Sequence, residues 1–193
     1  MNKLTKFLLE EISRLKAKNK KLKKKIKKFK SADDKETSSN LLENNSLENI
    51  LESTLEYPQL AIAYTDGSFS QEKNTAGYGI IFFHNGKTYK ESGKISRLKT
   101  EKLSSQSSET FAVIRAIDKA ILLKSKTIII YYDCTSITEW ADNVNSTNSR
   151  AAWYYKHLTK RKKKINVIFR KVKAHSGDLH NTEADQLAKK AIA

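Results

Sequence analysis

One run of six residues limits the possible folds of this 193-residue chain more than any other segment. Residues 127–132, Thr-Ile-Ile-Ile-Tyr-Tyr, are apolar at nearly every position and end directly before Asp133. A strand with one face in water would alternate between apolar and polar residues, so this run is typical of a strand buried on both faces of a sheet. It predicts an α/β fold with helices on both sides of the sheet.

The flanking segments supply the other elements of such a fold. Strand patterns occur at residues 60–65, 77–83, 87–92 and 165–172, and the Asn-Gly pair at 85–86 predicts a tight hairpin. Helical patterns occur at residues 108–123, around 136–141, at 151–160 and at about 182–192. We therefore expect a mixed five-stranded sheet flanked by helices, built from three antiparallel strands followed by helix, strand, helix, strand and helix.

Charge divides the chain into three parts. Residues 1–30 hold 12 Lys and 1 Arg against 2 Glu, whereas residues 31–58 hold 1 Lys against 7 acidic residues. Residues 59–193 hold 23 basic and 12 acidic residues, together with all six glycines. We predict a basic helical arm at 1–30, an acidic and in part helical connector at 31–58, and a globular domain at 59–193.

The overall composition excludes several classes of protein. The single cysteine excludes a disulfide framework and a zinc site made of several cysteines. No apolar run approaches the ~20 residues that span a bilayer, and lysines interrupt the apolar residues at the N-terminus. We expect a cytoplasmic protein with no membrane partner, and its net charge of +16 favours a polyanion such as nucleic acid.

The arm and the connector each permit two interpretations. Apolar residues from Leu8 to Phe29 follow a heptad spacing, but the flanking lysines would repel each other in a parallel pair of arms. The arm is then a solvated helix or a segment that binds phosphates. The connector is a solvated linker or an acidic helix that folds back on the arm. We expect a monomer, with association through the arm as the alternative.

Four carboxylates stand out within the domain. Asp66 and Asp133 directly follow predicted strands, where sites in open α/β sheets are usually built. Glu109 lies four residues before Val113 and so shares its buried helix face, which is costly for an acid without a cation or partner. Asp185 falls in the first turn of the last predicted helix. Together they suit a hard cation such as Mg²⁺ or Mn²⁺, although each one alone fits a helix cap, a turn or a surface charge.

The motifs around these acids resemble those of type 1 ribonuclease H, the bacterial ribonuclease HI family, over residues 60–193. The resemblance lies in Tyr-Thr-Asp-Gly-Ser at 64–68 followed by Ala-Gly-Tyr-Gly at 76–79, in Ser-Ser-Glu-Thr-Phe-Ala around Glu109, in Ile-Tyr-Tyr-Asp ending at Asp133, and in Val-Lys-Ala-His-Ser-Gly at 172–177 followed by Asn181 and Asp185. The closing motif is most similar to bacterial members with a viroplasmin-like N-terminal module, in whose place this chain has a lysine-rich helix.

The resemblance implies a ribonuclease H-like fold and an endonuclease that hydrolyses the RNA strand of RNA–DNA hybrids. Such enzymes use two Mg²⁺ ions, for which Mn²⁺ substitutes, and leave 5′-phosphate and 3′-hydroxyl ends. It also implies a role for each matching residue. Metal ligands would be Asp66, Glu109, Asp133 and Asp185; His175 would move protons or help product leave; and the substrate would contact Gly67, Ser68, Gln106, Ser107 and Asn181.

Three features depart from the family pattern. The segment 104–108, Ser-Ser-Gln-Ser-Ser, lacks the asparagines that many relatives place on RNA hydroxyls. The stretch between Asp133 and His175 leaves little room for a basic protrusion, and the N-terminus does not read as a hybrid-binding module. The run Arg-Lys-Lys-Lys at 161–164 and the arm are candidates for the contacts to nucleic acid that these features make in relatives. For the run, a solvated helix end is the alternative. Other readings are a different nuclease of the same superfold and a non-catalytic nucleic-acid-binding module.

Overall fold

The computed structural model describes residues 46–95, 103–142, 146–173 and 178–193. Ser46 to Ala193 form one compact unit. The predicted arm, its heptad seam, its contact with the connector and His175 lie outside the described residues. None of the described helices combines the length and the apolar composition needed to cross a membrane.

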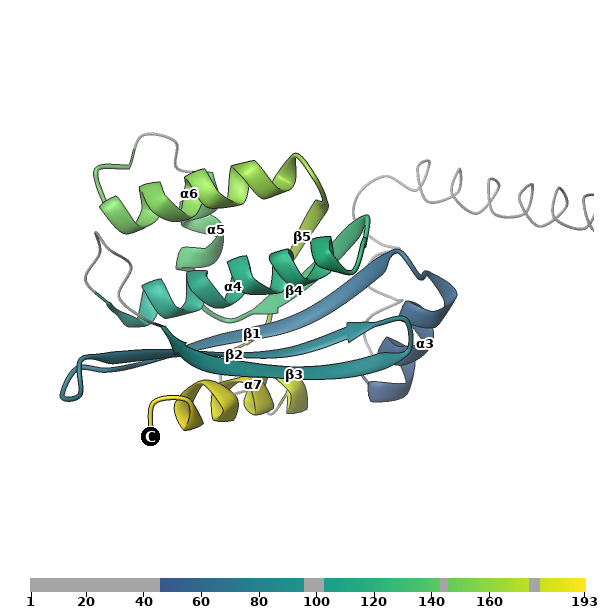
Figure 1. Ribbon diagram of the computed structural model, residues 1–193, viewed down its shortest axis with the longest axis horizontal. Helices are drawn as coiled ribbons and strands as arrows, with labels where there is room; N and C mark the ends of the chain where they lie inside the picture. Colours follow the sequence, from purple (N-terminus) through teal and green to yellow (C-terminus); the bar gives the residue numbers. More distant parts are fainter. Residues whose placement is uncertain (1–45, 96–102, 143–145, 174–177) are drawn as a thin grey trace, which may run out of the picture. The chain divides into compact units, whose positions relative to one another are not determined.

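Five strands form a single sheet in the order β3-β2-β1-β4-β5 (Figure 1). The strands β1, β2 and β3 pair antiparallel, whereas β4 and β5 pair parallel to β1 and to each other. This arrangement confirms the predicted mixed sheet. The elements in chain order are α3 (Leu47–Glu56), β1 (Leu60–Ser70), β2 (Thr75–His84), β3 (Lys87–Ile95), α4 (Ser105–Leu122), β4 (Thr127–Tyr132), α5 (Ser136–Ala141), α6 (Ser149–Lys162), β5 (Asn166–Lys171) and α7 (Leu179–Lys190).

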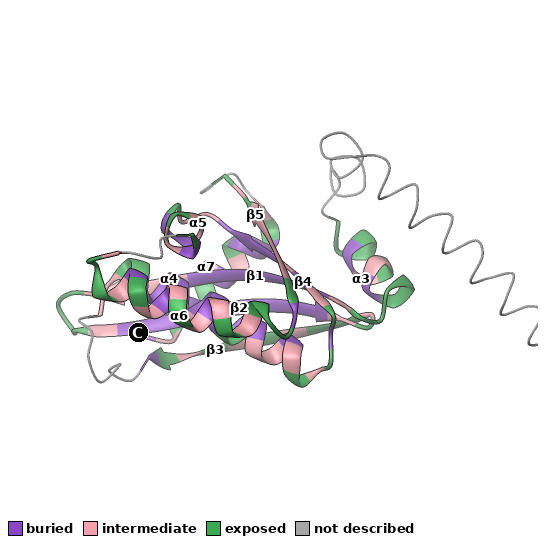
Figure 2. Cartoon of the chain, turned by 90° about the horizontal axis from the view of Figure 1, so that it is seen from above, coloured by how far each residue is buried: buried purple, intermediate pink, exposed green. Residues whose placement is uncertain are grey.

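Helices cover both faces of the sheet, which explains why its central strands lack alternation. On one face α4 lies against β1 and β2, and α6 packs on α4 (Figure 1). On the other face α7 lies against the same two strands. The central strands are accordingly almost continuously buried, whereas the edge strand β3 alternates between exposed and half-buried residues (Figure 2).

Helix α3 lies within the predicted acidic connector and belongs to the same compact unit as the sheet. Its Ile50 is buried in a cluster with Ile62 and Phe83, on the face that also carries α7. The backbone N–H of Gly86, in the β2–β3 hairpin, donates to Thr54 Oγ1 at 3.0 Å. The helix therefore packs on the end of the sheet nearest that hairpin.

Several element boundaries differ from those predicted, and those of β1 and α7 affect the candidate site. β1 continues past Asp66 to Ser70, because β2 goes on pairing with it as far as Thr75. α7 begins at Leu179, where Asp178 caps it by accepting from two backbone N–H groups at 3.0 Å. Asp185 therefore lies in the second turn of α7, and the prediction that it sits in the first turn was wrong.

Candidate active site

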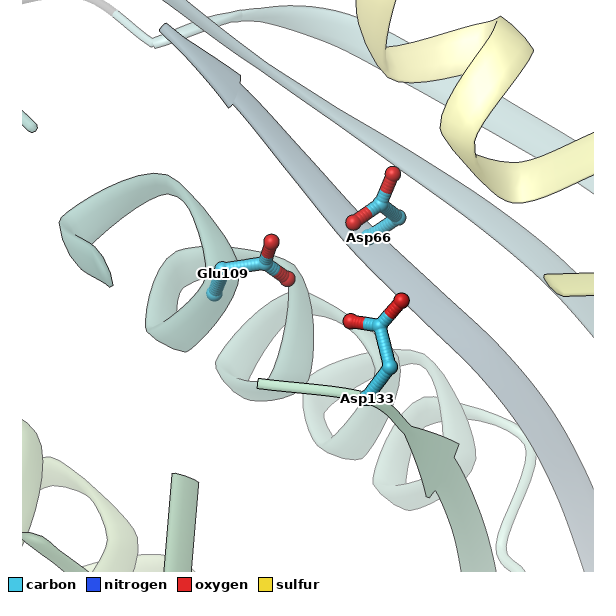
Figure 3. A group of neighbouring side chains, drawn as sticks. All are labelled: Asp66, Glu109 and Asp133. Atoms are coloured by element: carbon cyan, nitrogen blue, oxygen red, sulfur yellow. The ribbon is translucent and has the colours of Figure 1, made fainter. Parts of the chain in front are cut away.

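Three of the four predicted acids converge in the structure. Asp66, Glu109 and Asp133 each offer a carboxylate oxygen, and these oxygens lie within 4.8 Å of one another. The side chains point toward each other from β1, from α4 and from the end of β4 (Figure 3). Asp66 and Glu109 are each only 6% exposed.

The sheet places Asp66 and Asp133 by letting two neighbouring strands diverge. β1 and β4 pair in parallel only as far as Tyr64 and Tyr131. Beyond that point β1 stays with β2, while the chain after β4 leaves the sheet. The carboxyl ends of adjacent parallel strands therefore open, and both aspartates lie at this opening.

Glu109 reaches the aspartates because α4 packs unusually close to β1. A Cβ at Gly67 would lie 2.3 Å from the backbone N of Glu109, so only glycine permits this contact. The start of α4 is fixed by a capping box, in which Ser104 and Ser107 exchange side-chain and backbone hydrogen bonds. The Ser107 hydroxyl is thus committed to the helix cap.

Asp185 approaches the site from α7, outside the group of three. A Cβ at Gly79, which pairs with Asp66 in the sheet, would lie 2.1 Å from the carbonyl oxygen of Ala184. This close packing brings α7 against the part of the sheet that carries Asp66, and the charge of Asp185 contributes to raising the pKa of Asp66. Lys189 donates to Asp185 Oδ2 at 2.7 Å, one turn further along the helix.

Asn181 lies beside the carboxylates rather than apart from them. Its Nδ2 donates to Asp133 Oδ2 at 3.1 Å, across 48 residues of sequence. Its buried Oδ1 has no hydrogen-bond partner within the described part of the chain. The amide therefore holds Asp133 in place and leaves one acceptor for a further group.

The electrostatics of the site favour a bound cation. Burial raises the pKa of Asp66 to about 6, with further upward contributions from Asp133 and Asp185. Burial and the neighbouring Asp66 raise the pKa of Glu109 well above its usual value. Such groups resist ionising together unless positive charge joins them. Several hard carboxylate oxygens at short range fit Mg²⁺ or Mn²⁺, and no thiol or imidazole of the described residues belongs to this group.

The remaining predicted substrate residues differ in their exposure. Ser68 is half-buried in β1 and Gln106 is exposed in the first turn of α4. Sequence reasoning missed Lys189 as the partner of Asp185, although the spacing of four residues on a predicted helix was a usable signal. It also missed Arg150, whose Nη1 donates to Ser104 Oγ at 3.0 Å and ties α6 to the start of α4.

A mixed sheet of this strand order, with acids converging from within β1, from α4 and from the end of β4, defines the ribonuclease H-like fold. RNase H1 from the halophilic archaeon Halobacterium salinarum NRC-1 matches it with a TM-score of 0.57, covering 69% of this chain and 97% of that one at 17% identity. LC11-RNase H1, solved in complex with an RNA/DNA hybrid, matches with a TM-score of 0.54, covering 69% of this chain and 99% of that one at 17% identity.

The sequence comparisons give the family. The family model described as RNase H matches residues 58–193. Ribonuclease H of Francisella philomiragia is 30% identical over 144 residues, covering 68% of this chain and 90% of the relative. Ribonuclease H of Francisella tularensis subsp. novicida matches to the same extent. The chain belongs to the RNase H family, and it is a ribonuclease H enzyme, a hydrolase of the nuclease class.

Proposed function

We propose that this chain is a type 1 ribonuclease H that cuts the RNA strand of RNA–DNA hybrids with two divalent metal ions, Mg²⁺ or Mn²⁺. The observation that carries the proposal is the convergence of Asp66, Glu109 and Asp133 in a member of the RNase H family. A solved relative of the same fold holds an RNA/DNA hybrid, which supports this substrate. We expect 5′-phosphate and 3′-hydroxyl products.

The four acids share one task in this proposal, and Asn181 and His175 have others. Asp66, Glu109 and Asp133 hold the metal pair, and Asp185 completes the ligand set once it exchanges Lys189 for a cation. When bound, the ions supply an activated water and a Lewis acid for the leaving oxygen. Asn181 orients Asp133 through its amide N–H. His175 assists proton transfer or product release and is not required to hold metal.

Recognition of RNA requires contacts to the 2′-hydroxyl group. Gln106 is exposed beside Glu109 and carries both a donor and an acceptor, which suits a hydroxyl. The hydroxyl of Ser107 is used in the helix cap, so this residue contributes its backbone. The backbone of Gly67 and Ser68, next to Asp66, and the side chain of Asn181 complete the proposed set.

Cleavage of a hybrid with a label on either strand tests the proposal. We expect the wild-type chain to cut only the RNA strand, and only with Mg²⁺ or Mn²⁺. The Asp66→Asn variant should show no cutting above background while its circular dichroism spectrum stays unchanged. Asp142→Asn, the same change at an exposed aspartate, is the matched control and should cut normally. Wild-type rates from Asp66→Asn would disprove the metal-site assignment, and sensitivity of the products to phosphatase identifies their ends.

A further inference from the structure

A pocket of about 250 Å³ lies between α4 and α6 and includes none of the acids of the candidate active site. Asp118, one of its lining residues, is nine positions after Glu109 on α4. At the helical rise per residue this places it about 13 Å further along the helix. The pocket is lined by Asp118, Ile121, His157, Lys160, Arg161 and Lys164.

Arg161 links the two helices that form the pocket, because it donates hydrogen bonds to residues of both α4 and α6. Its Nε and Nη2 donate to the two carboxylate oxygens of Asp118, each at 2.7 Å. Its Nη1 donates to the backbone oxygen of His157 at 3.0 Å. This bidentate pair neutralises the acid and fixes the guanidinium, so Arg161 is not the free cation that the run at 161–164 suggests in the sequence.

His157 presents a donor of defined identity. Its Nδ1 lies 3.2 Å from Arg161 Nη1, and a guanidinium only donates, so Nδ1 must accept. The imidazole proton then resides on Nε2. Trp153 stacks on the ring with centroids 4.5 Å apart and holds its orientation. Burial and the neighbouring cations, Arg161 first among them, lower the pKa of His157, which agrees with a neutral ring.

Two lysines complete the pocket without being neutralised. Lys160 and Lys164 are exposed, and no salt bridge of the described residues includes either side chain. The lining therefore combines two lysine ammonium groups outside the described salt bridges with the imidazole of His157 and an internally paired Arg–Asp couple. The net positive charge of this lining suits a small anion.

We propose that this pocket binds a phosphodiester group of a nucleic-acid strand, outside the catalytic site. Its volume is below the range of pockets that enclose drug-sized ligands, which suits a single phosphate group rather than a whole nucleotide. Lysine ammonium groups are ordinary phosphate ligands. A glutamate of α3 cannot occupy the pocket as the anion, because α3 packs on the face of the sheet opposite to α4 and α6. The identity of the strand as part of a hybrid rests on the proposed function.

Binding of fluorescent nucleic acid to the full chain in EDTA across a salt series tests this site without cleavage. We expect the double variant Lys160→Gln/Lys164→Gln to bind the hybrid more weakly. Its slope of log affinity against log salt should be shallower by about 0.9, the value for one phosphate contact. A DNA duplex should show the same change, because phosphate contacts carry no sequence information.

The control variant is Lys162→Gln/Lys163→Gln, which removes two equally exposed charges from the same run but none that line the pocket. We expect it to change the slope clearly less. His157→Phe keeps a ring on Trp153 but removes the donor, so it should weaken binding without changing the slope. Equal losses from the two double variants, or no loss from the pocket variant, would overturn the proposal.

A separate measurement distinguishes the failure of this site from the failure of the proposed function. With Mg²⁺ and saturating hybrid, Lys160→Gln/Lys164→Gln should keep the wild-type turnover rate. If the wild-type chain does not cut hybrids at all, the proposed function fails, while the binding series in EDTA still decides whether the pocket takes phosphate.

Discussion

Asp66 and Glu109 are buried acids whose ionisation costs free energy unless a cation is present. Burial raises the pKa of Asp66 to about 6 and that of Glu109 well above its ordinary value. When the pKa of a carboxyl is higher in the folded state than in the unfolded state, the group contributes most to stability at a pH below its unfolded pKa, near pH 4. That contribution is lost as the pH rises through about 6, so the metal-free site destabilises the protein at neutral pH.

The change Asp66→Asn should therefore stabilise the metal-free protein. We expect its melting temperature in EDTA to exceed that of the wild type at about pH 7.5 and the difference to shrink toward about pH 5. Mg²⁺ should raise the melting temperature of the wild type more than that of the variant. Thermal unfolding over this pH range, with and without Mg²⁺, provides the measurement. Equal melting temperatures in EDTA at neutral pH would contradict the electrostatic argument.

Asn181 allows the positioning role and the substrate role to be separated. Asn181→Ala removes the donor to Asp133, and loss of such a supporting bond typically costs 10- to 100-fold in metal affinity or activity. We expect the Mg²⁺ concentration for half-maximal cleavage to rise. If Asn181 only reads 2′-hydroxyls, the variant will instead raise KM for the hybrid and leave the Mg²⁺ requirement unchanged.

His175 should assist the reaction without being indispensable. In the proposed mechanism the metal ions held by the acids would supply the activated water, so His175→Ala should slow turnover and leave measurable cleavage. Single-turnover and steady-state rates for this variant and for Asp66→Asn provide the comparison. A loss as complete as that of Asp66→Asn would show that the histidine is essential.

The residues of the site differ in how far sequence alone could reveal them. Glu109 could be found because helical spacing places an acid on an apolar face, and it is indeed buried. Asp66 and Asp133 could be found because each directly follows an apolar run in the sequence, although β1 in fact continues past Asp66. The bond from Asn181 to Asp133 could not, since it joins residues 48 positions apart and no local pattern encodes it. The close approach at Gly67 likewise depends on how α4 packs on β1.

At the scale of elements, β4 has the bounds predicted from its apolar run, whereas β1 and α7 do not. The length of β1 depends on its partner β2, and the start of α7 depends on the cap at Asp178. A helix in the connector was one of two predicted alternatives, but its packing against the sheet was not predicted. The acidic residues of α3 favour a solvated connector, and the one buried stripe around Ile50 is a weaker signal for packing against the sheet.

Packing of α3 predicts that it contributes to the stability of the domain. Ile50 is 2% exposed, and Ile→Ala at such a position costs about 2–5 kcal/mol. Leu47 on the same helix is 44% exposed, so Leu47→Ala should change the free energy of unfolding by about 0.5 kcal/mol or less. Urea unfolding of both variants provides the measurement. Equal stabilities would show that α3 is not part of the cooperative unit.

At the scale of the whole molecule, the positive charges of residues 1–30 and of the domain predict that both parts contribute to the affinity for nucleic acid. A chain that begins at Ser46 keeps α3 and loses the arm, unlike one that begins at Pro58, which would also lose α3. We expect the chain from Ser46 to keep its turnover rate at saturating hybrid and to bind with lower affinity. Its slope of log affinity against log salt should be shallower, since fewer counterions are released.

A salt series with the full chain and the chain from Ser46 tests this prediction. If the acidic residues at 31–58 screen the lysines, the difference in slope between the two chains will be smaller but still present. Equal affinities and equal slopes would show that the arm does not bind nucleic acid. Association of the full chain through residues 8–29, measurable by sedimentation, would then be the better explanation of the arm.

The position of α3 determines where the N-terminal residues join the domain. The helix packs at the hairpin end of the sheet, and Asp66 is five residues along β1 from the pair Ala61–His84 at that end, about 17 Å away. A phosphate-binding arm attached there would act as a tethered ligand, and its contribution would depend on its effective concentration near the hybrid. The length of residues 31–45 should then matter more than their identity. Lengthening them with a flexible insert would dilute the arm without removing a single lysine.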